Sequence, residues 1–198
     1  MADERLRLLL TADQISERVR ELGAQISADY AGRSPILIGV LKGSLVFMAD
    51  LCRAIRIPVT VDFMSITSYG DGQNSGVVRI LKDLDESITG RDVILVEDII
   101  DTGLTLTYLL ATLHARRPAS IEVCGLLDKT ARRIIEVPIR YSGFDIPDEF
   151  VIGYGLDHEG RYRNLSRVLG VRDMAVLREL DAVDRVNEVA TGETPDRA

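Results

Sequence analysis

Short apolar runs alternate with segments of helical periodicity along most of the chain. Residues 35–41 (PILIGVL) and 92–97 (DVILVE) are apolar runs of strand length, which are typical of strands buried on both faces. The whole pattern predicts helices over 12–30, 44–55 and 104–117, strands over 35–41, 59–67, 77–81, 92–97, 120–128 and 150–156, and a weaker strand over 137–144. Buried strands that alternate with helices predict an α/β domain with a largely parallel central sheet flanked by helices.

The first predicted helix carries a recognisable start signal. Thr11 and Gln14 have the spacing of a capping box, in which two side chains satisfy backbone N–H groups at the start of a helix. The apolar residues that follow recur at helical spacing: Ile15, Val19, Leu22 and Ile26. We therefore expect an amphipathic helix that begins directly after Thr11.

Two segments depart from this pattern. Residues 68–76 (SYGDGQNSG) are polar and rich in glycine, and they lie between two predicted strands, so we expect the tip of a long hairpin. After Arg172 the chain becomes more polar, with Val176, Leu180 and Val183 at helical spacing. We interpret residues 1–172 as one domain and 173–198 as a C-terminal helix with a polar tail that begins near Thr191.

Composition narrows the class of protein. The 198 residues are 46% hydrophobic, which is enough for one globular domain, and no run approaches the roughly 18–20 apolar residues of a membrane span. The N-terminal residues do not resemble a signal peptide. Cys52 and Cys124 lie in apolar contexts, which favours buried thiols in a reducing cytoplasm. The net charge of -7 argues against nucleic acid as a partner.

The stretch VILVEDIIDTGLT, residues 93–105, carries the most specific chemistry. An apolar strand runs into three acids and then into a Thr-Gly turn before a predicted helix. Free N–H groups at a helix start form an anion site without any lysine, so we expect phosphate there. Adjacent carboxylates would repel phosphate; they suit the vicinal hydroxyls of a sugar, or Mg²⁺ that itself carries phosphates. A sugar phosphate is the ligand that satisfies both subsites.

The same stretch resembles the phosphoribosyl-diphosphate signature of the type I phosphoribosyltransferases. Five further segments are similar, in order and spacing, to the hypoxanthine-guanine phosphoribosyltransferases: VLKGSLVFMADL, TSYGDGQNSGVVRILKDLD, LLDKTARR, GFDIPDEFVIGYGLD and RYRNL. Together the matching segments cover roughly residues 8–172. One motif alone would indicate only the superfamily, whereas the set indicates the branch that acts on 6-oxopurines.

The resemblance implies a fold and a reaction. The fold would be that of the type I phosphoribosyltransferases, with a small hood and a flexible hairpin lid. In the reaction of purine salvage, hypoxanthine or guanine displaces pyrophosphate from C1 of 5-phosphoribosyl 1-diphosphate and gives IMP or GMP. Mg²⁺ would be the cofactor, and the family implies a homodimer or homotetramer in the cytoplasm.

The resemblance also assigns residues to the sugar phosphate. Glu97 and Asp98 would bind the ribose hydroxyls directly or through Mg²⁺, for which Asp157 would be a further ligand. Asp101 would face N7 of the purine as the general base. It would also belong to the 5′-phosphate loop, whose members would be Asp101, Thr102, Gly103, Leu104 and Thr105. Some members of the family have lysine at the position of Leu104.

Further residues are assigned to the base and to pyrophosphate. Lys129 would donate to the 6-oxo group of the purine, which disfavours adenine because two donors would then face each other. Phe150 would stack on the purine, and the backbone of Val151 would contact its edge. The pyrophosphate contacts would come from Lys42, Gly43, Ser68, Tyr69 and Arg163. The family also implies a cis peptide bond between Leu41 and Lys42.

Two alternatives remain open at this point. One is a related phosphoribosyltransferase that uses another base, such as xanthine, or guanine only. The other is a regulator with the same fold that senses nucleotides and binds RNA. Lys129 and the stretch DEFVIGYGLD favour hypoxanthine and guanine, while the net charge, Asp101 and Lys129 argue against the regulator.

Overall fold

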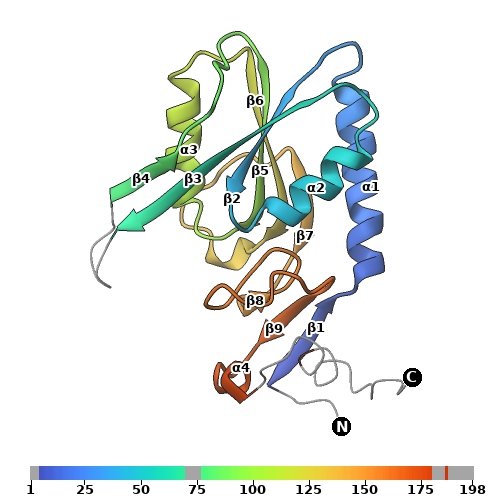
Figure 1. Ribbon diagram of the computed structural model, residues 1–198, viewed down its shortest axis with the longest axis vertical. Coiled ribbons are helices and arrows are strands. Elements are labelled where there is room, and N and C mark those ends of the chain that lie inside the picture. The colour runs from blue at the N-terminus through green and yellow to red at the C-terminus, as the bar shows by residue number, and fades with distance from the viewer. Residues whose placement is uncertain (1–4, 70–76, 180–185, 187–198) are drawn as a thin grey trace. The chain divides into compact units, whose positions relative to one another are not determined.

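A computed structural model describes residues 5–69, 77–179 and 186 of the chain (Figure 1). The chain divides into two compact units, one of residues 18–147 and the other of residues 1–17 together with 148–198. None of the helices in the described ranges combines the length and apolar character that are needed to cross a membrane. Each unit is described by itself below.

A six-stranded sheet forms the centre of the larger unit. Its strands are β2 (Ile36–Leu41), β3 (Thr60–Tyr69), β4 (Val77–Lys82), β5 (Asp92–Ile100), β6 (Ser120–Asp128) and β7 (Tyr141–Asp145). Their order is β4-β3-β2-β5-β6-β7, and every neighbouring pair is parallel except the hairpin of β3 and β4. The predicted α/β fold with a largely parallel sheet is confirmed.

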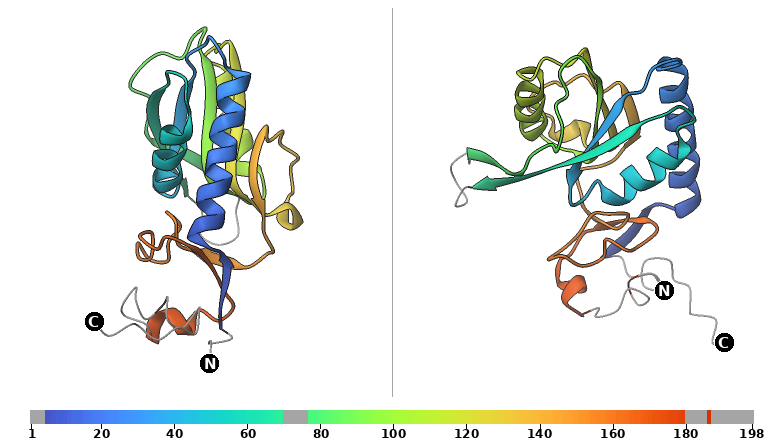
Figure 2. Two further views of the ribbon diagram at one scale, coloured as in Figure 1. Left: turned by 90° about the vertical axis from the view of Figure 1, so that its right-hand side faces the viewer. Right: turned by 45° about the horizontal axis from the view of Figure 1, so that its top comes forward.

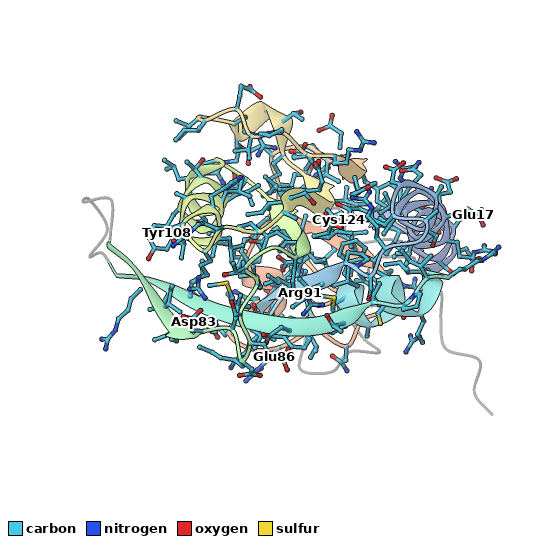
Figure 3. All side chains as sticks on the ribbon, turned by 90° about the horizontal axis from the view of Figure 1, so that it is seen from above. Glu17, Asp83, Glu86, Arg91, Tyr108 and Cys124 are labelled. Atoms are coloured by element: carbon cyan, nitrogen blue, oxygen red, sulfur yellow. The ribbon has the colours of Figure 1, made fainter. Side chains whose placement is uncertain are left out.

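Helices cover both faces of this sheet. The helices are α1 (Ala12–Asp29), α2 (Leu45–Ala54) and α3 (Leu104–His114). Ile36, Ile38 and Val40 of β2 join Leu106 and Leu109 of α3 in one buried cluster, as alternation along a strand requires. Figure 3 shows α3, marked by Tyr108, on one side of the strands and the coil of α1 on the other. The order of the strands and the positions of the helices confirm the layered architecture.

The predicted capping box at the start of α1 is confirmed. The Thr11 N–H donates to Gln14 Oε1 at 2.9 Å, and the Gln14 N–H donates to Thr11 Oγ1 at 3.2 Å. These two bonds satisfy N–H groups that the helix itself cannot. Replacement of such a cap by alanine typically costs about 1 kcal/mol.

The hairpin of β3 and β4 reaches beyond the other strands of the sheet (Figure 2). Ser68 and Tyr69 end β3, and their backbones pair with Val78 and Val77 of β4. The long hairpin predicted over this region is therefore present. Residues 70–76, the remainder of the predicted lid, lie outside the described residues.

The smaller unit contains an antiparallel sheet that the sequence pattern did not predict in full. Its strands are β1 (Leu6–Leu10), β8 (Phe150–Ile152) and β9 (Val168–Val171), in the order β1-β9-β8. Neither β1 nor β9 was predicted, because four or five apolar residues without alternation are ambiguous. The strand expected over 150–156 ends at Ile152, since positive φ angles at Gly153 and Tyr154 turn the chain. This unit corresponds to the small hood.

The segment after Arg172 contributes to the core of the hood. The short helix α4 (Ala175–Glu179) buries Val176 and Leu177, which cluster with apolar residues of β1, β8 and β9. The Tyr162 hydroxyl donates to the Leu177 carbonyl at 3.0 Å. Leu180, Val183 and the predicted tail from Thr191 lie outside the described residues.

Candidate active site

Strand β5 is longer than the sequence pattern indicated. Two of the predicted acidic site residues are therefore part of the strand. The strand was expected to end at Glu97, but its pairing with β6 continues as far as Ile100 opposite Asp128. The apolar run stops before Glu97, but backbone pairing does not require apolar side chains. The strand therefore continues beyond the end of the run. Glu97 and Asp98 therefore lie within the sheet instead of in the loop that follows it.

Neighbouring residues of a strand point to opposite faces, which separates Glu97 from Asp98. Glu97 lines a pocket of about 240 Å³ together with Val40 and Ile66. Asp98 lies against Gly43, where a Cβ atom would overlap Asp98 Oδ2. The structure thus brings Glu97 to the pocket and Asp98 to the Lys42–Gly43 segment.

The carboxyl group of Glu97 is the most deeply buried acid of this region. Its residue is only 7% exposed, and burial raises the pKa of Glu97 well above its ordinary value, with a further contribution from the charge of Asp98. A buried carboxylate is costly unless a cation or hydrogen-bond donors compensate it. The position therefore suits ligand hydroxyls or a cation.

The pocket also contains the Thr-Gly turn and the start of α3. Five of its lining residues were predicted to bind the sugar phosphate: Glu97, Asp101, Thr102, Gly103 and Thr105. Gly103 has a φ of +84°, and no side chain caps α3. The Leu104 N–H has only a long 3.4 Å bond to Thr102 Oγ1. Free N–H groups and the positive end of a helix dipole suit an anion, as the sequence predicted for this turn.

A segment that the sequence did not single out crosses this turn. The N–H groups of Ile134 and Ile135 both donate to the Thr102 carbonyl, at 3.0 and 3.1 Å. A Cβ atom at Gly103 would overlap the Ile135 carbonyl oxygen. Glycine is therefore required at position 103 by the close approach of the two backbones as well as by its positive φ.

Replacement of Gly103 by alanine is expected to destabilise the protein strongly. The strain of a left-handed residue costs about 1–3 kcal/mol, and the overlap with Ile135 adds to it. Gly90→Ala is the matched control, since Gly90 has a φ of +72° with no atom within 4 Å of the added Cβ. Urea unfolding of both variants measures the difference. Equal losses of stability in the two variants would contradict the close approach.

Asp101 and Lys129 lie at the ends of neighbouring strands. The Lys129 N–H donates to the Ile100 carbonyl at 2.9 Å, and Lys129 is buried, with 6% of its surface exposed. Asp101 Oδ2 lies 3.3 Å from Arg132 Nη1, while its Oδ1 is buried without a hydrogen-bond partner. An unpaired buried acceptor is uncommon in native proteins. The pairing of Asp101 with Arg132 was not predicted, because the arginine pair 132–133 carried no signal beyond its charge.

The next arginine, Arg133, forms a buried ion pair. Its side chain is 6% exposed, and Nη2 donates to Asp128 Oδ1. Burial raises the pKa of Asp128, and the charge of Arg133 opposes that rise. The pair closes the turn that carries Lys129.

The Lys42–Gly43 segment joins β2 to α2. The peptide bond between Leu41 and Lys42 is cis, as the resemblance implied. Ser44 precedes α2 without capping it, because its hydroxyl donates instead to the Val40 carbonyl at 2.7 Å. Gly43, which precedes this helix start, lies against Asp98.

The remaining predicted site residues belong to the smaller unit. Phe150 is 43% exposed and meets the ring of His158 edge to face, with centroids 5.9 Å apart. Val151 is buried in β8 and pairs with Gly170. Asp157 Oδ1 and Arg163 Nη2 form an ion pair at 2.6 Å. The residues that were expected to bind a cation and pyrophosphate thus bind each other in this structure.

A preformed metal cage is not part of this arrangement. Within the described residues, no three side chains of His, Cys, Asp or Glu gather as a metal site. Mg²⁺, however, is commonly bound by one or two carboxylates together with substrate phosphates. The uncompensated carboxyl of Glu97 in the pocket fits that mode of binding.

Comparisons with known proteins show the family to which the chain belongs. The family described as the phosphoribosyl transferase domain matches residues 9–159. The hypoxanthine-guanine phosphoribosyltransferase of Mycobacterium avium is 52% identical over 168 residues, which cover 81% of this chain and 83% of the relative.

Comparison with solved structures indicates the same family. The structure of a hypoxanthine-guanine phosphoribosyltransferase from Bacillus anthracis superposes with a TM-score of 0.80 and 45% identity, covering 86% of this chain and 99% of that chain. A structure that addresses the role of the C-terminal region on the oligomeric state and enzymatic activity of Trypanosoma cruzi hypoxanthine phosphoribosyl transferase has a TM-score of 0.83 and 40% identity. It covers 90% of this chain and 98% of that chain.

The fold, in which β5 leads through a Thr-Gly turn into α3, and the family match define a transferase of the phosphoribosyltransferase class. Within that class, the chain belongs to the hypoxanthine-guanine phosphoribosyltransferase family.

Proposed function

We propose that the pocket at the end of β5 carries out the reaction of the family. The chain transfers the 5-phosphoribosyl group from 5-phosphoribosyl 1-diphosphate to N9 of hypoxanthine or guanine, and it is an enzyme of purine salvage. The observation that carries the residue assignment is the grouping of Glu97, Asp101 and the start of α3 around one pocket. That pocket offers acids for a sugar beside N–H groups for a phosphate.

The 5′-phosphate is assigned to the turn from Asp101 to Thr105. The backbone N–H groups at the start of α3 donate to the phosphate oxygens, and the hydroxyls of Thr102 and Thr105 can add donors. Leu104 contributes only its N–H, since its side chain is apolar and 48% exposed. Fixing the phosphate at this turn holds the ribose against Glu97 and so positions C1 for reaction.

Mg²⁺ is the proposed cofactor, and it would neutralise charge on the departing pyrophosphate when bound. Glu97 and Asp98 are the proposed ligands, either directly or through the ribose hydroxyls. Because their side chains lie on opposite faces of β5, they would not chelate one ion as a simple pair. Asp157, in the smaller unit, stays a predicted ligand; its Oδ1 pairs with Arg163 Nη2 at 2.6 Å.

The purine is assigned to Lys129, Phe150, Val151 and Asp101. As N9 bonds to C1, the bond from C1 to pyrophosphate breaks and a proton must leave the base. Asp101 accepts that proton as the general base, since its Oδ1 has no other partner. Lys129 donates to the 6-oxo group, while Phe150 offers an exposed ring for stacking.

Pyrophosphate is assigned to Lys42 and Gly43 at the start of α2, and to Arg163. Lys42 and the N–H groups of this segment bring positive charge to the leaving group. Ser68 and Tyr69 at the end of β3 are assigned to the closed state of the hairpin, which would exclude water during transfer. The assembly as a homodimer or homotetramer and the cytoplasmic location stay predictions.

One assay tests the choice of base. Hypoxanthine, guanine, xanthine and adenine are each offered with 5-phosphoribosyl 1-diphosphate and Mg²⁺, and nucleotide formation is followed. We expect hypoxanthine and guanine to react, and adenine to be disfavoured by about 10²-fold or more, because its amino group would face the Lys129 ammonium. Lys129→Gln, whose amide can both donate and accept, should narrow this ratio. Equal use of adenine and hypoxanthine by the unmodified protein would contradict the role of Lys129.

A further inference from the structure

The buried guanidinium of Arg133 occupies an electrostatically unusual position. Its Cδ atom lies 3.4 Å from the point where a Cβ of Gly103 would be, so the side chain packs against the phosphate turn. Gly103 immediately precedes α3, whose start carries the positive end of the helix dipole. A cation at this end of a helix is unfavourable unless an anion is also present.

The protein satisfies only part of the hydrogen-bond donors of this guanidinium. Arg133 Nη2 donates to Asp128, but Nη1 is buried and has no hydrogen-bond partner. An arginine that is 6% exposed and retains an unused donor carries a large desolvation cost. The helix start and the buried guanidinium side chain packed next to it both favour an anion at this turn.

The chain has no other cation on the turn itself. Residues 101–105 are Asp, Thr, Gly, Leu and Thr, so the turn carries no cationic side chain of its own. Arg132 is engaged by Asp101 at 3.3 Å. Arg133 is therefore the cation that lies directly behind the turn, held there by Asp128 and by the backbone bonds of Ile134 and Ile135 to Thr102.

We infer that Arg133 is a positioning residue for the 5′-phosphate: its buried side chain packs against Gly103 and adds a fixed positive charge next to a turn that carries none of its own. This inference rests on the proposed function, because it takes the 5′-phosphate of the nucleotide as the anion. Arg133 does not contact the reacting atoms and has no part in proton transfer. Its contribution is to the affinity for the phosphate group.

The affinities for IMP and for inosine, which lacks the 5′-phosphate, distinguish a loss of phosphate binding from a general disturbance of the binding site. Titration calorimetry on Arg133→Met should show IMP affinity reduced by about tenfold, with inosine affinity within about twofold of the unmodified protein. KM for 5-phosphoribosyl 1-diphosphate should rise in parallel, while KM for hypoxanthine should not. Arg56→Met, which removes an exposed arginine of the same unit, serves as the control and should change none of these values.

Loss of the ion pair could itself weaken folding, so a second variant removes both partners. Asp128→Asn with Arg133→Met leaves no uncompensated buried carboxylate, and we expect the same selective loss for IMP. Leu104→Lys in the Arg133→Met background should recover part of the IMP affinity, because the charge is restored at the other side of the turn.

Three results would overturn the inference. The first is an unchanged affinity for IMP in Arg133→Met. The second is an equal loss for IMP and inosine in the double variant. The third is no recovery of IMP affinity with Leu104→Lys. Failure of the unmodified protein to bind IMP would overturn the proposed function and the inference with it, and that outcome is distinct because it precedes any substitution.

Discussion

Asparagine in place of Asp101 is expected to lower kcat for IMP formation by about 10²–10⁴-fold, the usual contribution of a general base. The amide has nearly the same shape as the carboxylate but cannot take the proton that leaves the purine. The turn that follows is held by backbone bonds to Ile134 and Ile135, so KM for 5-phosphoribosyl 1-diphosphate should change little. Steady-state kinetics with hypoxanthine as the varied substrate measures the effect.

The control for this experiment is Asp50→Asn on α2, where the carboxylate pairs with Arg53 and has no assigned role. It removes the same charge at another place in the same unit and should leave kcat unchanged. Activity of Asp101→Asn within a few-fold of the unmodified protein would show that Asp101 only orders the loop. A matching loss in Asp50→Asn would point to net charge as the cause.

Glutamine in place of Glu97 is expected to stabilise the ligand-free protein while impairing the enzyme. Burial raises the pKa of Glu97 well above 4.5, so the folded chain retains a proton that the unfolded chain has lost. Stability therefore falls as pH rises from about 4.5 through the raised pKa, and the full cost is present above it. Glutamine does not titrate and avoids this cost.

The measurement is the midpoint of thermal unfolding at several pH values, with chelator present and without substrate. The midpoint should rise in Glu97→Gln by about 2–4 °C for each kcal/mol of relieved burial cost, and more at pH 8 than at pH 5. Activity with 5-phosphoribosyl 1-diphosphate and Mg²⁺ should fall by about 10²-fold, since an amide is a weaker ligand for the cation and the ribose. The exposed Glu86→Gln is the control. A lower midpoint in Glu97→Gln at every pH would contradict an uncompensated carboxyl.

Glu97 and Asp101 lie four positions apart in the stretch of residues 93–105. Local sequence signals identified this stretch, whereas the surroundings of each acid depend on the tertiary fold. The sequence of residues 93–105 was sufficient to indicate a strand, a turn and a helix start with a phosphate site. Periodicity and capping signals are local, and local backbone bonds satisfy them, as the bonds between Thr11 and Gln14 show. For the same reason the three long helices and the buried strands β2, β5 and β6 could be predicted as elements.

Pairing between distant segments could not be predicted in this way. The short strands β1 and β9 exist because Leu6 pairs with Val171 across the length of the chain, and neither segment has a strong pattern by itself. The extension of β5 to Ile100 likewise depends on β6. Such contacts are set by the tertiary fold, where a short apolar segment gains stability only from its partner.

The sequence by itself determined the class of fold, the Thr-Gly turn before α3 and the acids near it, because each depends on neighbouring residues and a backbone geometry of short range. Only the tertiary structure decided to which face of the sheet each of these acids points. The alternation of β5 directs Glu97 into the pocket and Asp98 toward Gly43. The tertiary structure also brought Arg132 to Asp101 and Arg133 to Gly103. The electrostatic environment of a charged group depends on distances in space and not on separation along the chain.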